Sequence, residues 1–297
     1  MILIIPAHVV NFCAVYPMAR PIIAAITMPA FLIITGYLVN VNKHARDFAI
    51  HIAGIFIPYA IMVTGFAVLS MYLPTADRIE ELSVRAIAHK VFVTSIGPYW
   101  FLQTMIACSI IYYVCVRLLA TRMGLTSVML VFGVCLMTVA YSTQVLSPKI
   151  IPYYFFGAVL RQAGIDFTRF FRKSPLALLP LVVLLLHEDT RDYGSSAIPV
   201  VAFCTISFLG WMDGQVRRCV LYRHFLYVGA NTLPIYLFHP IFTMLAKLYL
   251  PLFAFDRTGL LHAFITVVLA TEGSLALAYA MDRTHLTRLF GRPAILR

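Results

Sequence analysis

Charged side chains are scarce in this chain of 297 residues, and their scarcity excludes a water-soluble domain. Only 12% of the residues are charged, whereas soluble domains average about 25%. Hydrophobic residues make up 61% of the chain and the mean hydropathy is +0.88, so too little polar surface remains to cover a soluble protein of this size. The composition predicts an all-α helix bundle that crosses a membrane many times.

Several motifs are also missing, and their absence narrows the chemistry. The six cysteines show no CxxC spacing, which excludes a disulfide framework and a cysteine-based zinc site. No HExxH, GxSxG, Walker or GxGxxG pattern occurs, so zinc hydrolysis, an α/β-hydrolase triad and P-loop chemistry lose their usual support. We expect no metal and no permanently bound cofactor.

Apolar runs bounded by charges, proline and glycine predict the transmembrane helices. No lysine or arginine precedes Arg20, so the first run lacks the basic region of a signal peptide and is interpreted as a retained span. It is short for a crossing, and we expect its beginning to be cut off. The runs at 149–164 and 175–187 are also shorter than the roughly 20 residues of a full crossing. In all, ten helices are predicted, near 1–17, 21–41, 48–73, 98–119, 125–146, 149–164, 175–187, 195–212, 226–253 and 260–281.

Basic residues outnumber acidic ones, 23 to 12, which gives a net charge of +11. In a soluble chain this excess would favour nucleic-acid binding, but in a membrane chain it records orientation. Ten crossings divide the loops into two sets, and the larger set of basic residues comprises Lys43, Arg46, Arg117, Arg122, Arg161, Arg169, Arg172, Lys173, Arg217, Arg218, Arg223, Arg283, Arg288, Arg292 and Arg297. The positive-inside rule places that set, and both termini, in the cytoplasm. No nucleic-acid partner is expected.

Ionisable groups inside the predicted spans are candidates for function, because they are costly to insert into a bilayer. His8 lies two residues after Pro6 in the first run, and Asn11 would share its face of a helix. Neutral imidazole takes up a proton near pH 7, which suits a general base. A structural, hydrogen-bonded histidine is the alternative at this stage.

The ninth predicted span carries a polar seam around His239. Asn231, Thr232 and Tyr236 precede this histidine at helical spacing. Such a seam suits a site, and it equally suits interhelical hydrogen bonds that hold a bundle together.

Two oppositely charged residues fall in the last two predicted spans. Lys247 and Glu272 would meet if those spans are antiparallel neighbours. No chain of further carboxylates extends from them, so a structural ion pair is favoured over a proton relay.

Four segments in order resemble the membrane-bound acyltransferase 3 family. They are the first apolar span with His8, MPAFLIITGYL at 28–38, GPYWFL at 97–102 and VGANTLPIYLFHPIF at 228–242. The resemblance covers most of the chain and implies one integral-membrane domain over 1–297. It also implies a multi-pass protein of the inner cell membrane that moves an acyl group, usually acetyl from cytoplasmic acetyl-CoA, onto a hydroxyl of a sugar or surface glycan. Short members similar to fucose O-acetylases match best in length.

The resemblance also assigns roles to residues. His8 matches the catalytic histidine of the family's first helix, Tyr236 and His239 match its ninth-span motif, and Trp100 matches its fourth-span tryptophan. An aromatic belt at the membrane surface is the ordinary explanation for Trp100. The family carries an arginine about three turns before the histidine, and here that position would precede Met1. An inactive acyltransferase-like protein is therefore one alternative, and a glycan or lipid transporter is another.

Acyl transfer to an alcohol requires a base, a stabilised oxyanion and the exclusion of water. With His8 as the base, the sequence offers several oxyanion donors without selecting one: Asn11, Thr35, Asn231 and Tyr236. Guanidinium groups pair well with the phosphates of CoA, so Arg161, Arg117 and Arg122 are expected to hold the donor, although orientation and anionic lipid also explain basic residues here. The sugar acceptor is expected in the outer loops around 73–97 and 187–195.

Overall fold

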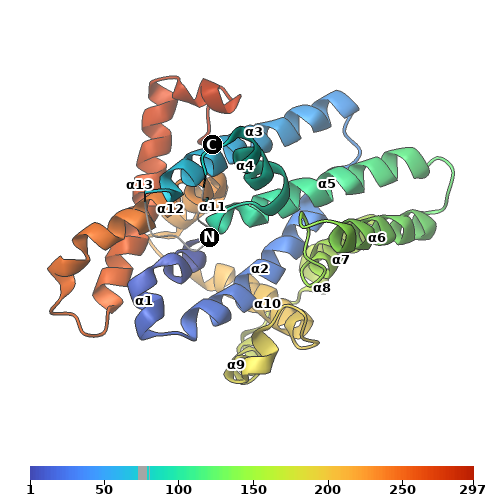
Figure 1. The fold of residues 1–297 in the computed structure, drawn as a ribbon. Helices are drawn as coiled ribbons and strands as arrows, with labels where there is room; N and C mark the ends of the chain where they lie inside the picture. Colours follow the sequence, from blue (N-terminus) through green and yellow to red (C-terminus); the bar gives the residue numbers. More distant parts are fainter. Residues whose placement is uncertain (73–78, 80) are drawn as a thin grey trace. The chain divides into compact units, whose positions relative to one another are not determined.

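The computed structural model describes residues 1–72, 79 and 81–297, and all the regular structure in that part of the chain is helical (Figure 1). Within it, six segments are long and apolar enough to cross a membrane. They are α2 (Ala19–Leu38), α3 (Ala45–Ser70), η3 with α5 (Gly97–Leu119), α6 (Leu125–Ser142), α12 with η6 (Thr232–Phe253) and α13 (Leu260–Arg283). The prediction of an all-helical protein with many spans is confirmed. The other predicted crossings fall on shorter or less apolar helices.

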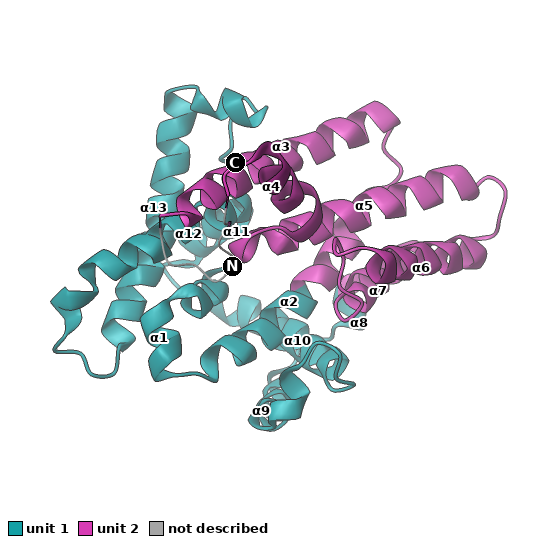
Figure 2. Cartoon of the chain, viewed as in Figure 1, with its two compact units in different colours: residues 1–30, 168–297 teal, residues 31–167 magenta. Residues whose placement is uncertain are grey.

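The chain forms two compact units, coloured separately in Figure 2. Unit 1 consists of Met1–Ala30 and Thr168–Arg297, and unit 2 consists of Phe31–Phe167. Helix α2 begins in unit 1 and ends in unit 2. Each unit contains long apolar helices.

Unit 2 contains α3, α5 and α6 together with shorter elements. These are α4 (Val84–His89), the π-helical turn η2 (Lys90–Thr94), the 3-10 turn η3 (Gly97–Tyr99) and α7 (Ile151–Gln162). Helix α4 and η2 lie in the predicted outer loop at 73–97, where the sequence contains no long apolar run that would predict a helix. Residues 73–78 and 80 of that loop lie outside the described residues.

Two glycines bring α2 and α7 into backbone contact within unit 2. A Cβ on Gly36 would overlap the carbonyl oxygen of Tyr154, and a Cβ on Gly157 would overlap that of Ile33. Small residues at such crossings allow helices in a membrane to approach closely and gain van der Waals contact. The polar side chain nearby is also satisfied, because the Tyr154 and Ser109 hydroxyls are 2.9 Å apart and hydrogen-bonded. Unit 2 is thus held by close helix packing and paired polar groups.

Unit 1 has more numerous and shorter elements. Besides the start of α2, they are η1 (Ile2–His8), α1 (Val10–Val15), α8 (Phe167–Phe170), η4 (Pro175–Ala177), α9 (Leu178–Leu186), η5 (Glu188–Arg191), α10 (Ile198–Val216), α11 (Tyr222–Ala230), α12 (Thr232–Tyr249), η6 (Leu250–Phe253), α13 and η7 (Leu286–Phe290). The antiparallel pair α12 and α13 forms its centre, and η1 packs against both helices.

The prediction of one helix over 1–17 is wrong. The segment is the 3-10 helix η1 followed by α1, and the extended backbone of Val9 separates them, with φ −85° and ψ 103°. Pro6 lies inside η1 and has no N–H to donate to a preceding turn. The thiol of Cys13 instead turns back toward the carbonyl oxygens of Pro6 and Ala7, at 3.6 and 3.5 Å. His8 is consequently the last residue of η1.

The single helix predicted over 226–253 is likewise two helices. Asn231, with φ −109° and ψ 37°, separates α11 from α12. Pro234 lies in the first turn of α12, where its missing N–H is tolerated, but it leaves the carbonyl of Ala230 without a donor from a continuing helix. The break therefore follows from the missing N–H of Pro234, which an apolar pattern does not reveal.

An apolar cluster fixes η1 against the other helices of unit 1. Ile5 is completely buried and packs with Val228 of α11, Ile235 of α12, and Ala270 and Leu275 of α13. Because Ile5 lies one turn before His8 in η1, burying it also fixes the place of the histidine. Apolar packing thus positions a polar residue.

The predicted ion pair between Lys247 and Glu272 is wrong. The carboxylate of Glu272 instead meets the ring of His224 in α11, with Nε2 and Oε1 2.9 Å apart. The sequence suggested only Lys247 as a partner, because His224 precedes the span predicted at 226–253 and was expected in a loop.

Candidate functional site

The rings of His8 and His239 lie side by side in the interior of unit 1. Their centroids are 5.4 Å apart and their planes are inclined by 52°. The ring of Tyr236, one turn earlier in α12, is 5.8 Å from that of His239. His239 is completely buried, whereas His8 is partly exposed. Three residues that the sequence proposed as catalytic are therefore brought together, and His8 is the more exposed histidine of the pair.

His239 is oriented by its own helix. Its Nδ1 lies 2.9 Å from the carbonyl oxygen of Tyr236 and 3.1 Å from that of Ile235. Pro240 follows and cannot donate to the carbonyl four residues earlier, which is that of Tyr236, so the histidine supplies the missing donor. The Nε2 atom of His239 is buried and has no hydrogen-bond partner among the described residues. The ring of His8 likewise makes no hydrogen bond in that part of the chain.

A second buried histidine, His262, gives a structural comparison. It lies near the start of α13, and only 2% of its surface is exposed. Its Nε2 lies 3.1 Å from the carbonyl oxygen of Ala246 and links α13 to α12. Its neighbours are the aromatic rings of Tyr249 and Phe253, and no second histidine is in ring contact with it. His262 therefore holds two helices together and lacks the paired arrangement of His8.

The other oxyanion candidates have different surroundings. Because the helix breaks at Val9, Asn11 does not follow His8 at helical spacing, and its side-chain amide lies against Gly259 at the start of α13. Thr35 donates to the carbonyl of Phe31 in its own helix, at 2.7 Å. The Oδ1 of Asn231 accepts the backbone N–H of Arg297 at 2.7 Å. Of the four candidates, Tyr236 alone shows a ring contact with the histidine pair.

The loop at 187–195, which the sequence predicts as an outer loop, packs against the start of α2. Arg191 binds the carbonyl oxygens of Leu185 and Leu186 at the end of α9, and its Nη1 reaches the sulfur of Met18 at 3.1 Å. Burial raises the pKa of Tyr193 to about 12, although the charge of Arg20 opposes this shift and Asp192 adds to it. Arg20 also lies close enough to His8 to interact with it electrostatically. This loop, predicted as an acceptor region, belongs to the same unit as the histidine pair.

The arginines predicted to hold CoA lie in unit 2. Arg117 is in the last turn of α5, Arg122 lies in the short connection to α6, and Arg161 is in the last turn of α7. All three are exposed. The guanidinium of Arg161 lies 5.6 Å from the ring centre of Tyr37, and a hydrogen bond of 2.7 Å from Gln162 to the hydroxyl of Tyr112 joins the end of α7 to α5. The three arginines thus lie at or next to helix ends of unit 2.

Trp100 is the first residue of α5, directly after the turn Gly97–Tyr99. Its ring meets that of Phe101 edge to face, with centroids 6.3 Å apart. Gly97 has a positive φ of 55°, and a Cβ there would press against the ring of Phe66. This glycine therefore allows the sharp turn that begins the helix of Trp100.

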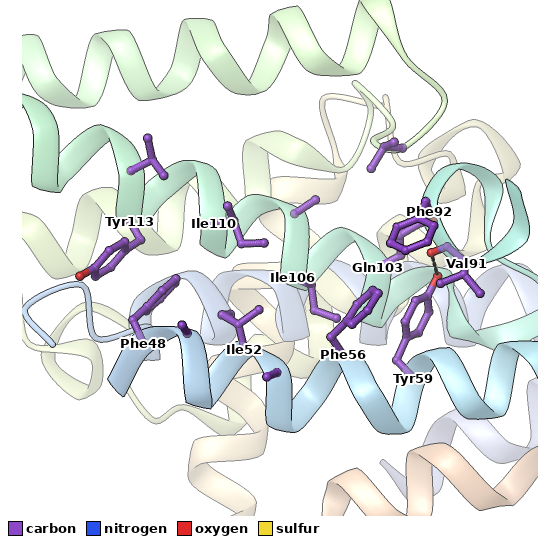
Figure 3. Close-up of a pocket in the computed structure, with 15 residues that line it drawn as sticks. Phe48, Ile52, Phe56, Tyr59, Val91, Phe92, Gln103, Ile106, Ile110 and Tyr113 are labelled. Carbon is purple, nitrogen blue, oxygen red and sulfur yellow. Dashed lines mark hydrogen bonds between the residues drawn. The ribbon is translucent and has the colours of Figure 1, made fainter. Parts of the chain in front are cut away.

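Unit 2 also contains an apolar cavity of about 590 Å³ between α3 and α5 (Figure 3). Aromatic and aliphatic side chains from both helices line it, and none of the lining residues is a histidine, carboxylate, lysine or arginine. Two tyrosines there donate to backbone carbonyls, Tyr59 to Val91 and Tyr113 to Lys43. Gln103 is 7% exposed, and its side-chain Nε2 makes no hydrogen bond within the described residues. The cavity offers space for an apolar group but no acid–base chemistry.

Comparison with known proteins agrees with the resemblance. A family model described as an acyltransferase domain, that of the acyltransferase 3 family, matches residues 1–281. No curated protein and no solved structure matches the chain. The match extends over nearly the whole chain and includes both histidines of the pair in unit 1. This multi-span membrane protein therefore belongs to the acyltransferase 3 family.

Proposed function

We propose that the protein is a membrane O-acyltransferase that moves an acyl group, in the first instance acetyl, from acyl-CoA to a hydroxyl of a sugar or surface glycan. His8 is the general base. The observation that carries the proposal is the pairing of His8 with His239, in which one ring is partly exposed and the other completely buried. Membership of the family supplies the reaction class.

His8 removes the proton of the acceptor hydroxyl as the oxygen attacks the thioester carbonyl. The tetrahedral intermediate carries a negative charge on oxygen, which nearby donors stabilise. Collapse of the intermediate forms the ester and expels the CoA thiolate, which takes the proton from His8. Tyr236 is the favoured oxyanion donor because its ring lies beside His239. The apolar packing around Ile5 limits the access of water.

The donor is proposed to bind through its phosphates to arginines of unit 2. Arg161, Arg117 and Arg122 lie at the ends of helices on one side of that unit, and their guanidinium groups are exposed. Arginine pairs with phosphate through two parallel hydrogen bonds. Arg161 is the first choice because Tyr37 holds its side chain in place. In the predicted orientation this side faces the cytoplasm of a cell with an inner membrane, where acetyl-CoA is available.

The acceptor is proposed to approach past the outer loop of unit 1. Arg20, Tyr193 and Asp192 lie close enough to interact electrostatically, and such groups bind sugar hydroxyls through hydrogen bonds. The charge of Arg20 also acts on His8. An acceptor bound by this loop is therefore proposed to present its hydroxyl to the histidine that is partly exposed.

The experiment that tests the function uses the full chain in lipid nanodiscs with labelled acetyl-CoA and a mixture of oligosaccharides. We expect release of the CoA thiol together with label on the sugar. Replacing Arg161 with Gln should raise KM for acetyl-CoA about tenfold and leave kcat within about twofold, since a lost charged hydrogen bond is worth roughly 1.5–3 kcal/mol.

Arg257 provides the control for the arginine variant, since it lies in the loop between α12 and α13. Its replacement by Gln should leave both constants unchanged. In sealed proteoliposomes, movement of glycan across the membrane without CoA release would contradict the enzyme and favour a transporter. A fall in kcat with unchanged KM for Arg161→Gln would contradict the proposed donor site alone.

A further inference from the structure

The tautomer of His239 follows from its surroundings. Both atoms within hydrogen-bond distance of its Nδ1 are carbonyl oxygens, those of Ile235 and Tyr236. A carbonyl oxygen accepts hydrogen bonds and cannot donate them. The Nδ1 atom must therefore carry the proton, and in the neutral ring Nε2 keeps a lone pair. The backbone of α12 thus assigns one nitrogen of His239 as a donor and the other as an acceptor.

This acceptor is buried without a partner. The Nε2 atom makes no hydrogen bond with any described residue and is shielded from solvent. A buried polar atom without a partner costs free energy, and such an exception in a native structure calls for an explanation. The same residue is 0% exposed, so a sugar cannot reach the lone pair directly. The acceptor is available to a neighbouring side chain.

His8 is the neighbouring side chain that can satisfy it. Its ring centre lies 5.4 Å from that of His239, it comes from a different element, and its ring nitrogens make no hydrogen bond in the described part of the chain. A neutral imidazole has one N–H to donate. Rotation of the His8 ring, which leaves the Nδ1 contacts of His239 intact, is the movement that would bring that N–H to the Nε2 of His239. Catalytic hydrogen bonds often tighten in this way only when substrate is bound.

We propose that His239 is a positioning residue that accepts the N–H of His8 and thereby fixes which nitrogen of His8 keeps the lone pair. This inference rests on the proposed function, because it assigns a role to the partner of the proposed base. With one nitrogen of His8 held by His239, the other carries the lone pair on the partly exposed side. When the hydroxyl proton moves to His8, both of its nitrogens are protonated, and His239 stays neutral throughout. The buried carboxylate of a serine hydrolase fixes a histidine by the same logic.

Two substitutions of His239 test the roles of its two ring nitrogens separately. Asparagine places an amide near the position of Nδ1, so His239→Asn keeps the donor to Tyr236 and loses the acceptor. Glutamine reaches the position of Nε2, so His239→Gln keeps an acceptor oxygen there and loses the donor. We expect His239→Asn to fold normally with kcat lowered at least about 100-fold. We expect His239→Gln to have a lower Tm but to keep kcat within about tenfold of the natural protein.

His262 provides the matched control, because its nitrogens have the opposite roles. Its Nε2 is the donor, to Ala246, so His262→Gln should keep stability and His262→Asn should lower Tm. Both His262 variants should keep full kcat. Equal loss of kcat in the two folded His239 variants would overturn the positioning role, and so would full activity of His239→Asn.

A measurement on the unsubstituted protein makes the test independent of folding in the variants. Nitrogen-15 NMR of labelled histidine distinguishes protonated from bare ring nitrogens. We expect a single neutral tautomer for His8, and a mixture of both in His239→Asn. A mixture in the natural protein would overturn the inference. If instead His8→Ala keeps full acyl transfer while His8 shows one tautomer, the proposed function of His8 fails and the hydrogen bond between the histidines survives.

Discussion

The two units of the molecule bury polar groups in different ways. In unit 2 the buried tyrosines find partners: Tyr154 pairs with Ser109, Tyr112 with Gln162, and Tyr59 with the carbonyl of Val91. In unit 1 two buried histidines, His239 and His262, each leave one ring nitrogen without a partner in the described part of the chain. Of these two histidines, His239 is the one whose ring lies beside a second histidine, His8, and its unpaired nitrogen is therefore the one that we assign to chemistry.

This difference indicates that unit 2 is a structural scaffold and that unit 1 holds the candidate site. Unit 2 gains its close packing from the glycine crossing of α2 and α7 and holds an apolar cavity. Unit 1 breaks its apolar helices at Val9 and Asn231, and the first break ends η1 at His8. Broken helices in a membrane expose backbone and polar side chains that must be satisfied within the protein. The irregular unit is therefore where reactive side chains can be held apart from lipid.

The largest effect on stability is expected at the glycine crossing of unit 2. Replacing Gly157 with Ala forces a methyl group into the carbonyl oxygen of Ile33, and backbone cannot move aside as a flexible side chain can. We expect the free energy of unfolding in mixed micelles to fall by about 3 kcal/mol. Acyl transfer per folded molecule should change much less.

Gly65 in α3 is the control for this prediction, because a Cβ there meets nothing within 4 Å. Gly65→Ala should be neutral or should stabilise the protein by up to about 1 kcal/mol, as expected for a helix interior. If Gly157→Ala is as stable as Gly65→Ala, then α2 and α7 are not in backbone contact, and the scaffold role of unit 2 is wrong.

A smaller effect of opposite sign is expected in the apolar cavity. Gln103 is buried without a hydrogen bond in the described part of the chain, so Gln103→Leu removes a desolvated amide. We expect the free energy of unfolding to rise by about 1 kcal/mol. Gln162→Leu, which removes the donor to Tyr112, should lower it by about the same amount. A loss of stability in Gln103→Leu would show that the amide has a polar partner and that unit 2 also holds a binding site.

Composition and periodicity were sufficient to predict the class of fold. The scarcity of charge predicts a helical membrane protein, and the long apolar runs at 125–146 and 260–281 correspond closely to α6 and α13. Hydropathy over a window predicts such helices because each must satisfy its own backbone in lipid. Hydropathy over a window does not predict the short elements. Helix α4 and the turn η2 occupy a segment with no long apolar run.

The contacts within the candidate site depend on breaks that hydropathy does not register. His8 and Asn11 share a helical face only if the first helix is continuous, and Val9 interrupts it. The partner of Glu272 is His224 of α11, which precedes the span predicted at 226–253. The dipeptide His239–Pro240 did contain a usable signal, since a proline leaves the carbonyl four residues earlier without its donor. The ring of His239 supplies the missing donor from its Nδ1 atom, and this hydrogen bond fixes the tautomer of the ring.

The most direct test of the whole account compares His8→Ala with His262→Ala in lipid nanodiscs, by transfer of labelled acetyl from acetyl-CoA to an oligosaccharide. The account predicts that His8→Ala keeps the Tm of the natural protein and loses acyl transfer by at least about 100-fold. It predicts that His262→Ala has a lower Tm, because the carbonyl of Ala246 loses its donor, and that its folded fraction keeps full kcat. Full acyl transfer by well-folded His8→Ala would contradict the central claim.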